Sequence, residues 1–143
     1  MATATQLIAD GRRARPEHRL SDARRLYAEA AALYRPDDQL AYAHTIRHIA
    51  DMFLEESRHA DAQPLYEEAL ELYRGSLNTK LIDLANTVRP YALLQSQLGN
   101  REVARELWQE ARILYAALRI EAGVRECEEH LDRFEGQPLD GGG

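Results

Sequence analysis

One stretch of this chain, about 16 residues long, occurs three times. The copies read SDARRLYAEAAALYR (residues 21–35), HADAQPLYEEALELYR (residues 59–74) and REVARELWQEARILYA (residues 101–116). The matching positions are Ala23, Leu26, Tyr27, Ala30, Leu33 and Tyr34 in the first copy, Ala62, Leu65, Tyr66, Ala69, Leu72 and Tyr73 in the second, and Ala104, Leu107, Trp108, Ala111, Leu114 and Tyr115 in the third. Such self-similarity is typical of a solenoid of stacked repeats, whose extended surface commonly binds another molecule.

Each copy has the periodicity of an amphipathic helix. In the second copy, Leu65, Tyr66, Ala69, Leu72 and Tyr73 fall on one stripe, and charged residues fall opposite. We therefore predict a helix with one buried face. Its alanines leave room for a neighbouring helix to approach closely, and the aromatic rings fill the space further out.

The segments that precede the second and third copies also resemble each other. They span residues 39–56 and 80–98, and both have helical periodicity. Ala43, Thr45, Ile46, Arg47 and Ala50 of the first align with Ala85, Thr87, Val88, Arg89 and Ala92 of the second. The offset of 42 residues is the same as that from Ala62 to Ala104 in the second and third copies. The repeating unit is therefore predicted to be a helix–turn–helix pair.

The repeats suggest one all-α domain, a right-handed α-solenoid of about three units with about six or seven helices. The predicted boundaries are 1–135 for the domain, 1–35, 36–77 and 78–118 for the units, 119–135 for a capping helix and 136–143 for a disordered tail. The first unit is divergent, because Gly11 and Pro16 weaken its first helix. The capping helix follows from an apolar stripe over residues 120–134 with charged residues opposite.

Turn-forming residues separate the predicted helices. Asp37 or Asp38 is expected to cap the helix of the second unit, and Asn78 or Thr79 that of the third. Gly75 is expected to supply a left-handed helix end.

Two prolines and one glycine fall at marked positions of the pattern. Gly99 is expected to form the tight turn within the third unit. Pro64 is expected in the first turn of its helix, where a missing N–H costs little. Pro90 lies well inside a predicted helix, which it is expected to kink or open locally.

Composition narrows the class of protein. The chain has 143 residues, a net charge of −6 and a single cysteine. The negative charge argues against nucleic-acid binding, and the basic segment at residues 11–25 is interpreted as a solvated face rather than a phosphate-binding patch. No signal peptide or membrane-spanning run is evident, so we predict a cytoplasmic protein without membrane contact. Preference for arginine and alanine is typical of a GC-rich bacterial genome.

The repeated residues resemble those of tetratricopeptide repeats. The spacing of Gly99, Ala104, Trp108 and Ala111 fits that pattern, and the string AQPLYEEALEL resembles the longer, kinesin-light-chain-like variety. The resemblance covers residues 5–134. It implies a non-enzymatic scaffold or adaptor that binds a partner protein or peptide in a concave groove, lined mainly by the first helix of each pair.

The resemblance implies a set of candidate groove residues. They are His44, Arg47, His48 and Asp51 on the second unit and Asn86, Arg89, Ser96 and Gln97 on the third. Arg47 and Arg89 are equivalent in the repeat, and two guanidinium groups suit an acidic segment or C-terminal carboxylate. The alternative is that each arginine pairs with a nearby acid of this chain, such as Asp51 or Asp83.

Two groups of residues have the spacing of chemical sites. His44, His48 and Asp51 follow one helical face and suggest a zinc or nickel site, or a metal or small-molecule sensor, although the HExxH motif is absent. The favoured interpretation is two groove-facing or partly packed histidines. Cys127 and His130 are three residues apart, but Cys127 lies on an apolar stripe and is interpreted as a core residue. We therefore predict no cofactor, no metal and no enzymatic activity.

Two further alternatives concern larger surfaces. The tyrosines and Trp108 of the three copies have the composition of a stacking platform for single-stranded nucleic acid, but their spacing indicates packing between helices. A chain with few repeats and an irregular first unit can also pair its ends. A homodimer is therefore the main alternative to a scaffold for another protein.

Overall fold

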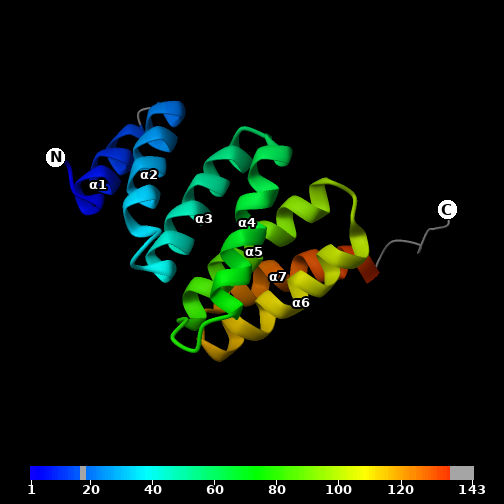
Figure 1. The fold of residues 1–143 in the computed structure, drawn as a ribbon. Coiled ribbons are helices and arrows are strands. Elements are labelled where there is room, and N and C mark those ends of the chain that lie inside the picture. Colours follow the sequence, from blue (N-terminus) through cyan, green and yellow to red (C-terminus); the bar gives the residue numbers. More distant parts are fainter. Residues whose placement is uncertain (17–18, 136–143) are drawn as a thin grey trace. The chain divides into compact units, whose positions relative to one another are not determined.

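The structure is a computed structural model that describes residues 1–16 and 19–135. These residues form seven helices and no strand (Figure 1). The helices are α1 (Ala4–Ala14), α2 (Leu20–Tyr34), α3 (Gln39–Glu55), α4 (His59–Arg74), α5 (Leu81–Gln97), α6 (Arg101–Ala117) and α7 (Glu121–Glu135). The all-α class is confirmed. The tail predicted to be disordered, residues 136–143, lies outside the described part of the chain.

The helices belong to two compact units, Met1–Thr79 and Lys80–Gly143. In the first unit α1 packs on α2, α2 on α3, and α3 on α4. In the second unit α6 packs between α5 and α7. Each helix therefore packs on its sequence neighbours within its unit, which is consistent with a helical repeat. The prediction of one domain over residues 1–135 stays a prediction. No helix among the described residues has the length and apolar character that crossing a bilayer requires.

Alanine occupies fully buried positions of the repeat pattern. These alanines are Ala23, Ala30, Ala43, Ala50, Ala62 and Ala69 in the first unit and Ala85, Ala92, Ala104 and Ala111 in the second. A side chain of one carbon lets the backbones come close without leaving a void. The predicted packing role of these positions is confirmed in both units.

Aromatic rings fill the wider spaces between helices. Tyr27, Tyr66, Tyr73 and Trp108 are each at most 2% exposed. Trp108 also donates from Nε1 to Ser96 Oγ at 3.0 Å, so its polar edge is satisfied inside the core. The interpretation of these rings as packing residues is therefore confirmed.

Three turns share a left-handed residue after a helix. The residues are Ser57 (φ 58°) after α3, Gly99 (φ 82°) after α5 and Arg119 (φ 60°) after α6. In each turn the next N–H bonds back to a carbonyl five residues earlier, as in Arg58 N–Phe53 O at 2.8 Å. This is the Schellman arrangement. Gly99 forms the predicted tight turn.

The predicted caps are partly right. Asp38 Oδ1 accepts from Ala41 N at 3.0 Å, as expected for an N-cap. The expectation for Gly75 is wrong, because its φ of −85° is right-handed. The expected cap at Asn78 or Thr79 is also wrong: α5 begins one residue later, and the Thr79 hydroxyl instead donates to the carbonyl of Tyr73 at 2.6 Å.

Both prolines inside helices lie deeper than a first turn. Because α4 begins at His59, Pro64 is in its second turn, so the expectation of a first-turn position is wrong. The carbonyl that loses its partner belongs to Ala60, which is exposed and accessible to water. Helix α5 continues through the buried Pro90 as one element.

We predict opposite stability changes at two equivalent turn positions. Gly99→Ala should lower the free energy of unfolding by about 1 kcal/mol, because a methyl group there meets no atom within 4 Å and the cost is the left-handed backbone alone. Ser57→Gly should raise it by about 0.5 kcal/mol because the strain of a positive φ is removed. Urea unfolding of both variants checks this, and equal signs would contradict it.

Removal of the Trp108 ring should be among the most damaging single changes. Trp108→Ala should lower the free energy of unfolding by about 3–5 kcal/mol, because the indole is fully buried. Trp108→Phe keeps most of the apolar volume and should cost clearly less. A cost below about 1 kcal/mol for the alanine variant in urea unfolding would contradict a packing role.

Candidate functional site

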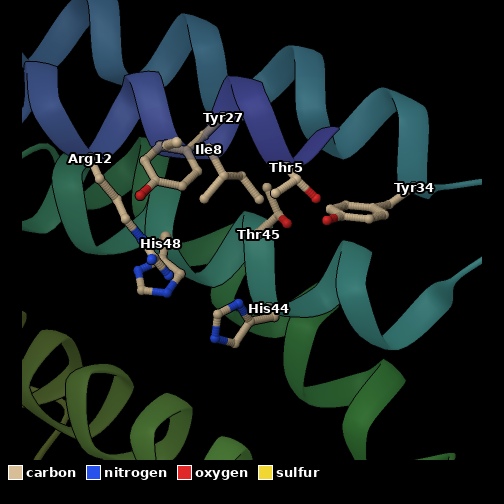
Figure 2. Close-up of a pocket in the computed structure, with 9 residues that line it drawn as sticks. Thr5, Ile8, Arg12, Tyr27, Tyr34, His44, Thr45 and His48 are labelled. Carbon is tan, nitrogen blue, oxygen red and sulfur yellow. The ribbon is translucent and has the colours of Figure 1, made fainter. Parts of the chain in front are cut away.

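A polar hollow of about 310 Å³ lies in the first unit between α1 and α3 (Figure 2). It is lined by Thr5, Ile8, Ala9 and Arg12 of α1, Tyr27 and Tyr34 of α2, and His44, Thr45 and His48 of α3. We call it the α1–α3 hollow. Its volume lies at the lower end of the range for small ligand sites.

Helical spacing brings the lining residues together. Thr5, Ile8 and Arg12 follow one another at i, i+3 and i+7 and so share one face of α1. His44 and His48 are four apart on α3 and lie on adjacent turns. Figure 2 shows Arg12 reaching from α1 toward His48, whereas Thr5 and Tyr34 lie together at the other end. The hollow therefore has a cationic, imidazole-bearing end and a hydroxyl-bearing end.

The two histidines form an aromatic stack with Tyr27. The His44 and His48 rings meet edge to face with centroids 4.6 Å apart, and the His48 ring lies 5.8 Å from the Tyr27 ring at an interplanar angle of 16°. Burial, followed by the positive charge of Arg47, lowers the pKa of His48 to about 3. The imidazole is therefore neutral near pH 7. Its Nδ1 is buried and has no hydrogen-bond partner among the described residues.

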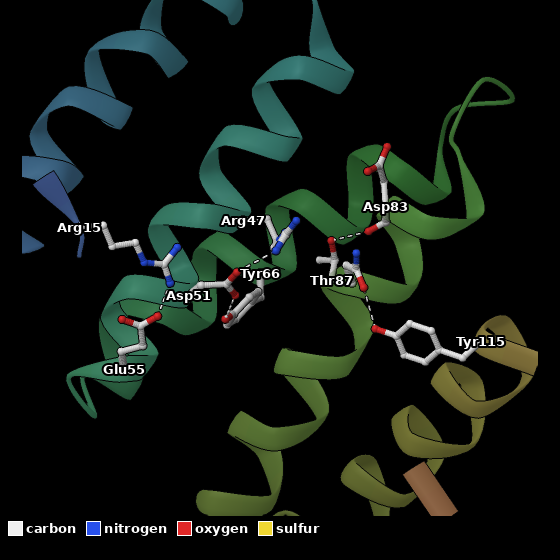
Figure 3. A network of polar contacts seen from close by, with 9 residues as sticks. Arg15, Arg47, Asp51, Glu55, Tyr66, Asp83, Thr87 and Tyr115 are labelled. Carbon is white, nitrogen blue, oxygen red and sulfur yellow. Dashed lines mark hydrogen bonds and ion pairs between the residues drawn. The ribbon is translucent and has the colours of Figure 1, made fainter. Parts of the chain in front are cut away.

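Arg47 and Asp51 form an ion pair with each other and are not among the residues that line the α1–α3 hollow (Figure 3). Arg47 Nη1 lies 2.8 Å from Asp51 Oδ2, and the Tyr66 hydroxyl donates to Asp51 Oδ1 at 2.5 Å. Burial raises the pKa of Asp51, although Arg47 and Tyr66 act in the opposite direction. Both carboxylate oxygens are thus already engaged, and the predicted alternative of an Arg47–Asp51 pair is what the structure contains.

The grouping of His44, His48 and Asp51 stays a prediction as a metal site. Within the described residues, no three histidine, cysteine, aspartate or glutamate side chains come together as possible ligands. The Asp51 carboxylate is held by Arg47 and Tyr66.

The candidate residues of the second unit have partners within that unit. Arg89 donates twice to Glu126 of α7, with distances of 2.5 and 2.9 Å, and not to Asp83 as the alternative proposed. Asn86 Oδ1 accepts from the Tyr115 hydroxyl at 2.7 Å. Ser96 accepts from Trp108, and Gln97 is exposed.

Cys127 lies in the core, whereas the His130 ring stacks on an aromatic ring. Cys127 is fully buried, and burial raises the pKa of its thiol to about 11, so it is protonated near pH 7. The His130 ring lies parallel to Trp108 with centroids 3.9 Å apart. The interpretation of Cys127 as a core residue is confirmed.

Sequence reasoning missed Thr5, Arg12 and Tyr34 as lining residues. The first helix does not match the repeat pattern, and that pattern predicts packing for Tyr34, which is half-buried. The signal for α1 is its i, i+3, i+7 spacing of polar and apolar residues.

Comparison with known proteins adds no family. The chain matches no protein-family model, and a search of curated proteins finds no match.

Protonation of His48 should oppose folding in mild acid. Its pKa is about 3 in the folded chain and near 6.5 when exposed, so unfolding takes up a proton between these values. Titration of His48 then leaves the free energy of unfolding unchanged above pH 6.5 and lowers it as the pH falls from 6.5 toward 3. In His48→Gln, the fall in unfolding free energy over this window should be shallower, by at most about 1.4 kcal/mol per pH unit.

Urea unfolding at pH 7, 6, 5 and 4 measures this slope. His59→Gln, on α4, removes an imidazole outside the hollow and serves as the control. Identical slopes for the wild type and His48→Gln would contradict the prediction.

Proposed function

We propose that this chain is a tetratricopeptide-type solenoid that binds a partner peptide through the α1–α3 hollow. The residue pattern favours that family, and the helical packing within each unit is compatible with it. In such solenoids the first helix of each pair lines the groove, and α1 and α3 are the first helices of their pairs. The observation that carries the proposal is that the polar hollow of the first unit lies between these two helices.

The chemistry of the hollow favours a carboxylate. Arg12 is the charged residue in the lining, and a guanidinium group donates two parallel hydrogen bonds to a carboxylate. The hydroxyls of Thr5 and Tyr34 offer further polar contacts. A hollow of about 310 Å³ has room for a terminal carboxylate and one neighbouring side chain.

This proposal moves the acid-binding role from Arg47 to Arg12. Arg47 is already paired with Asp51, so binding a partner's carboxylate would require that pair to break. Arg12 lies at an exposed edge of the hollow and is accessible. His44 and His48 keep the groove role that the sequence predicted.

We expect selection from a peptide library with free C-termini to recover acidic sequences. Arg12→Glu should weaken binding of the selected peptides by at least about tenfold, because an attraction becomes a repulsion. Arg13→Glu is the matched control, since Arg13 is adjacent on α1, is exposed and does not line the hollow. Anisotropy of the labelled peptides measures both variants.

Equal binding by wild type and Arg12→Glu would overturn the proposal. Amidation of the peptide C-terminus separates a terminal carboxylate from an acidic side chain. The homodimer stays the main alternative, and light scattering without any peptide tests it.

A further inference from the structure

A second and larger hollow of the first unit lies on different helix faces. It has a volume of about 890 Å³ and is open to solvent. It is lined by Ser21, Arg24, Arg25, Ala28, Ala31, Ala32, Arg35 and Pro36 at the α2 side, Tyr42, Ile46, Ile49 and Phe53 of α3, and Leu65 of α4. We call it the α2–α4 groove.

The floor of the groove is an apolar ridge on α3. Tyr42, Ile46, Ile49 and Phe53 follow at i, i+4, i+7 and i+11 along one face of that helix. Tyr42, Ile46 and Ile49 are buried, whereas Phe53 is half-buried. The side chains on the α2 side of the groove are small because many of them are alanines. Ala28 and Ala32 among them are exposed. These small side chains leave the space above the ridge unfilled.

The charged side chains that line the groove are all arginines, although the whole chain carries a net charge of −6. Two of these three arginines have a glutamate of this chain beside them. The Arg24 guanidinium lies 4.6 Å from the Phe53 ring centre and 2.9 Å from Glu56 Oε1. The Arg35 guanidinium lies 5.5 Å from the Tyr42 ring centre. Arg25 is exposed, with Glu29 at 3.5 Å.

We propose that the α2–α4 groove binds an acidic amphipathic helix of a partner protein. The α2 lining extends from Ser21 to Pro36, about 22 Å at the rise of an α-helix, which accommodates about four turns. An apolar stripe with i, i+3, i+4 and i+7 spacing would cover the α3 ridge. Acidic residues beside that stripe would face Arg25 and Arg35.

A helix fits this groove better than an extended strand. A strand gains affinity through main-chain hydrogen bonds to an exposed sheet edge. The walls here are helices, whose backbone groups are already paired within each helix. The groove therefore offers side-chain packing and cationic groups, which are the features that an amphipathic helix uses.

This chain has an acidic amphipathic helix of its own, but that helix already packs within the second unit. It is α7, which packs on α6 and buries Cys127 completely. A second copy could supply α7 only by detaching it from α6 and exposing that apolar face. This cost favours a separate partner protein as the occupant.

The probe is a labelled 15-residue peptide with leucine at heptad spacing and glutamate at most other positions. Fluorescence anisotropy should show saturable binding to the wild type. A peptide with lysine in place of each glutamate should bind at least about tenfold more weakly, because like charges then face each other. A scrambled peptide of the same composition should also bind weakly, because it has no continuous apolar stripe.

Two variants locate the peptide. Arg25→Glu with Arg35→Glu should weaken binding by at least about tenfold, and Ala32→Trp should do the same by filling the groove without a change in charge. The matched control is Arg105→Glu with Arg125→Glu, which makes the same charge change at exposed positions of the second unit. Circular dichroism verifies that every variant is folded. Arg12→Glu should leave this peptide's affinity unchanged, so this test and the test of the α1–α3 hollow can fail separately.

Three results would overturn the inference. One is the absence of saturable binding to the wild type. Another is an affinity that neither groove variant changes while both remain folded. The third is a wild-type dimer in light scattering that Arg25→Glu with Arg35→Glu dissociates, because a second copy would then occupy the groove.

Discussion

Close approach of paired helices at alanine is the constraint on which the other features depend. In the first unit α3 packs on α4, and the repeat alanines of these two helices, Ala43, Ala50, Ala62 and Ala69, are fully buried. Because these side chains have no rotamers, the approach is fixed by backbone contact rather than by side-chain choice. The larger rings and the polar groups then take the positions that remain. The hollows of the first unit also depend on small side chains, because those on α2 leave space above α3.

The two units use one backbone pattern with different polar contacts. Thr45 and Thr87 are equivalent, buried and bonded to the carbonyl four residues earlier, at 2.7 and 2.8 Å. Arg47 and Arg89 are also equivalent, yet Arg47 binds an acid of its own helix whereas Arg89 of α5 binds Glu126 of α7. In the second unit α7 thus supplies the acid that α3 supplies from within itself in the first.

Periodicity predicted the buried alanines and aromatic rings of the repeats, because burial on one helix repeats every three to four residues, but Leu33 of the same pattern is 47% exposed. The helix bounds and the Asp38 cap also followed from the sequence. The conformation of Gly75 did not, since a glycine permits a left-handed turn without requiring one. The α2–α4 groove could not be predicted either. A helical pattern shows which face is covered. The space left between neighbouring helices depends on the summed volume of the side chains that both helices place between them.

Helix α3 presents different residues on its two sides. At 100° per residue, the α3 residues of the α1–α3 hollow and those of the α2–α4 groove centre about 120° apart, so the two surfaces draw on adjacent faces of one helix. No α3 residue lines both surfaces. Under the two proposals, one helix would carry two separate binding surfaces of different chemistry, and both would depend on the packing of α3 on α2 and α4.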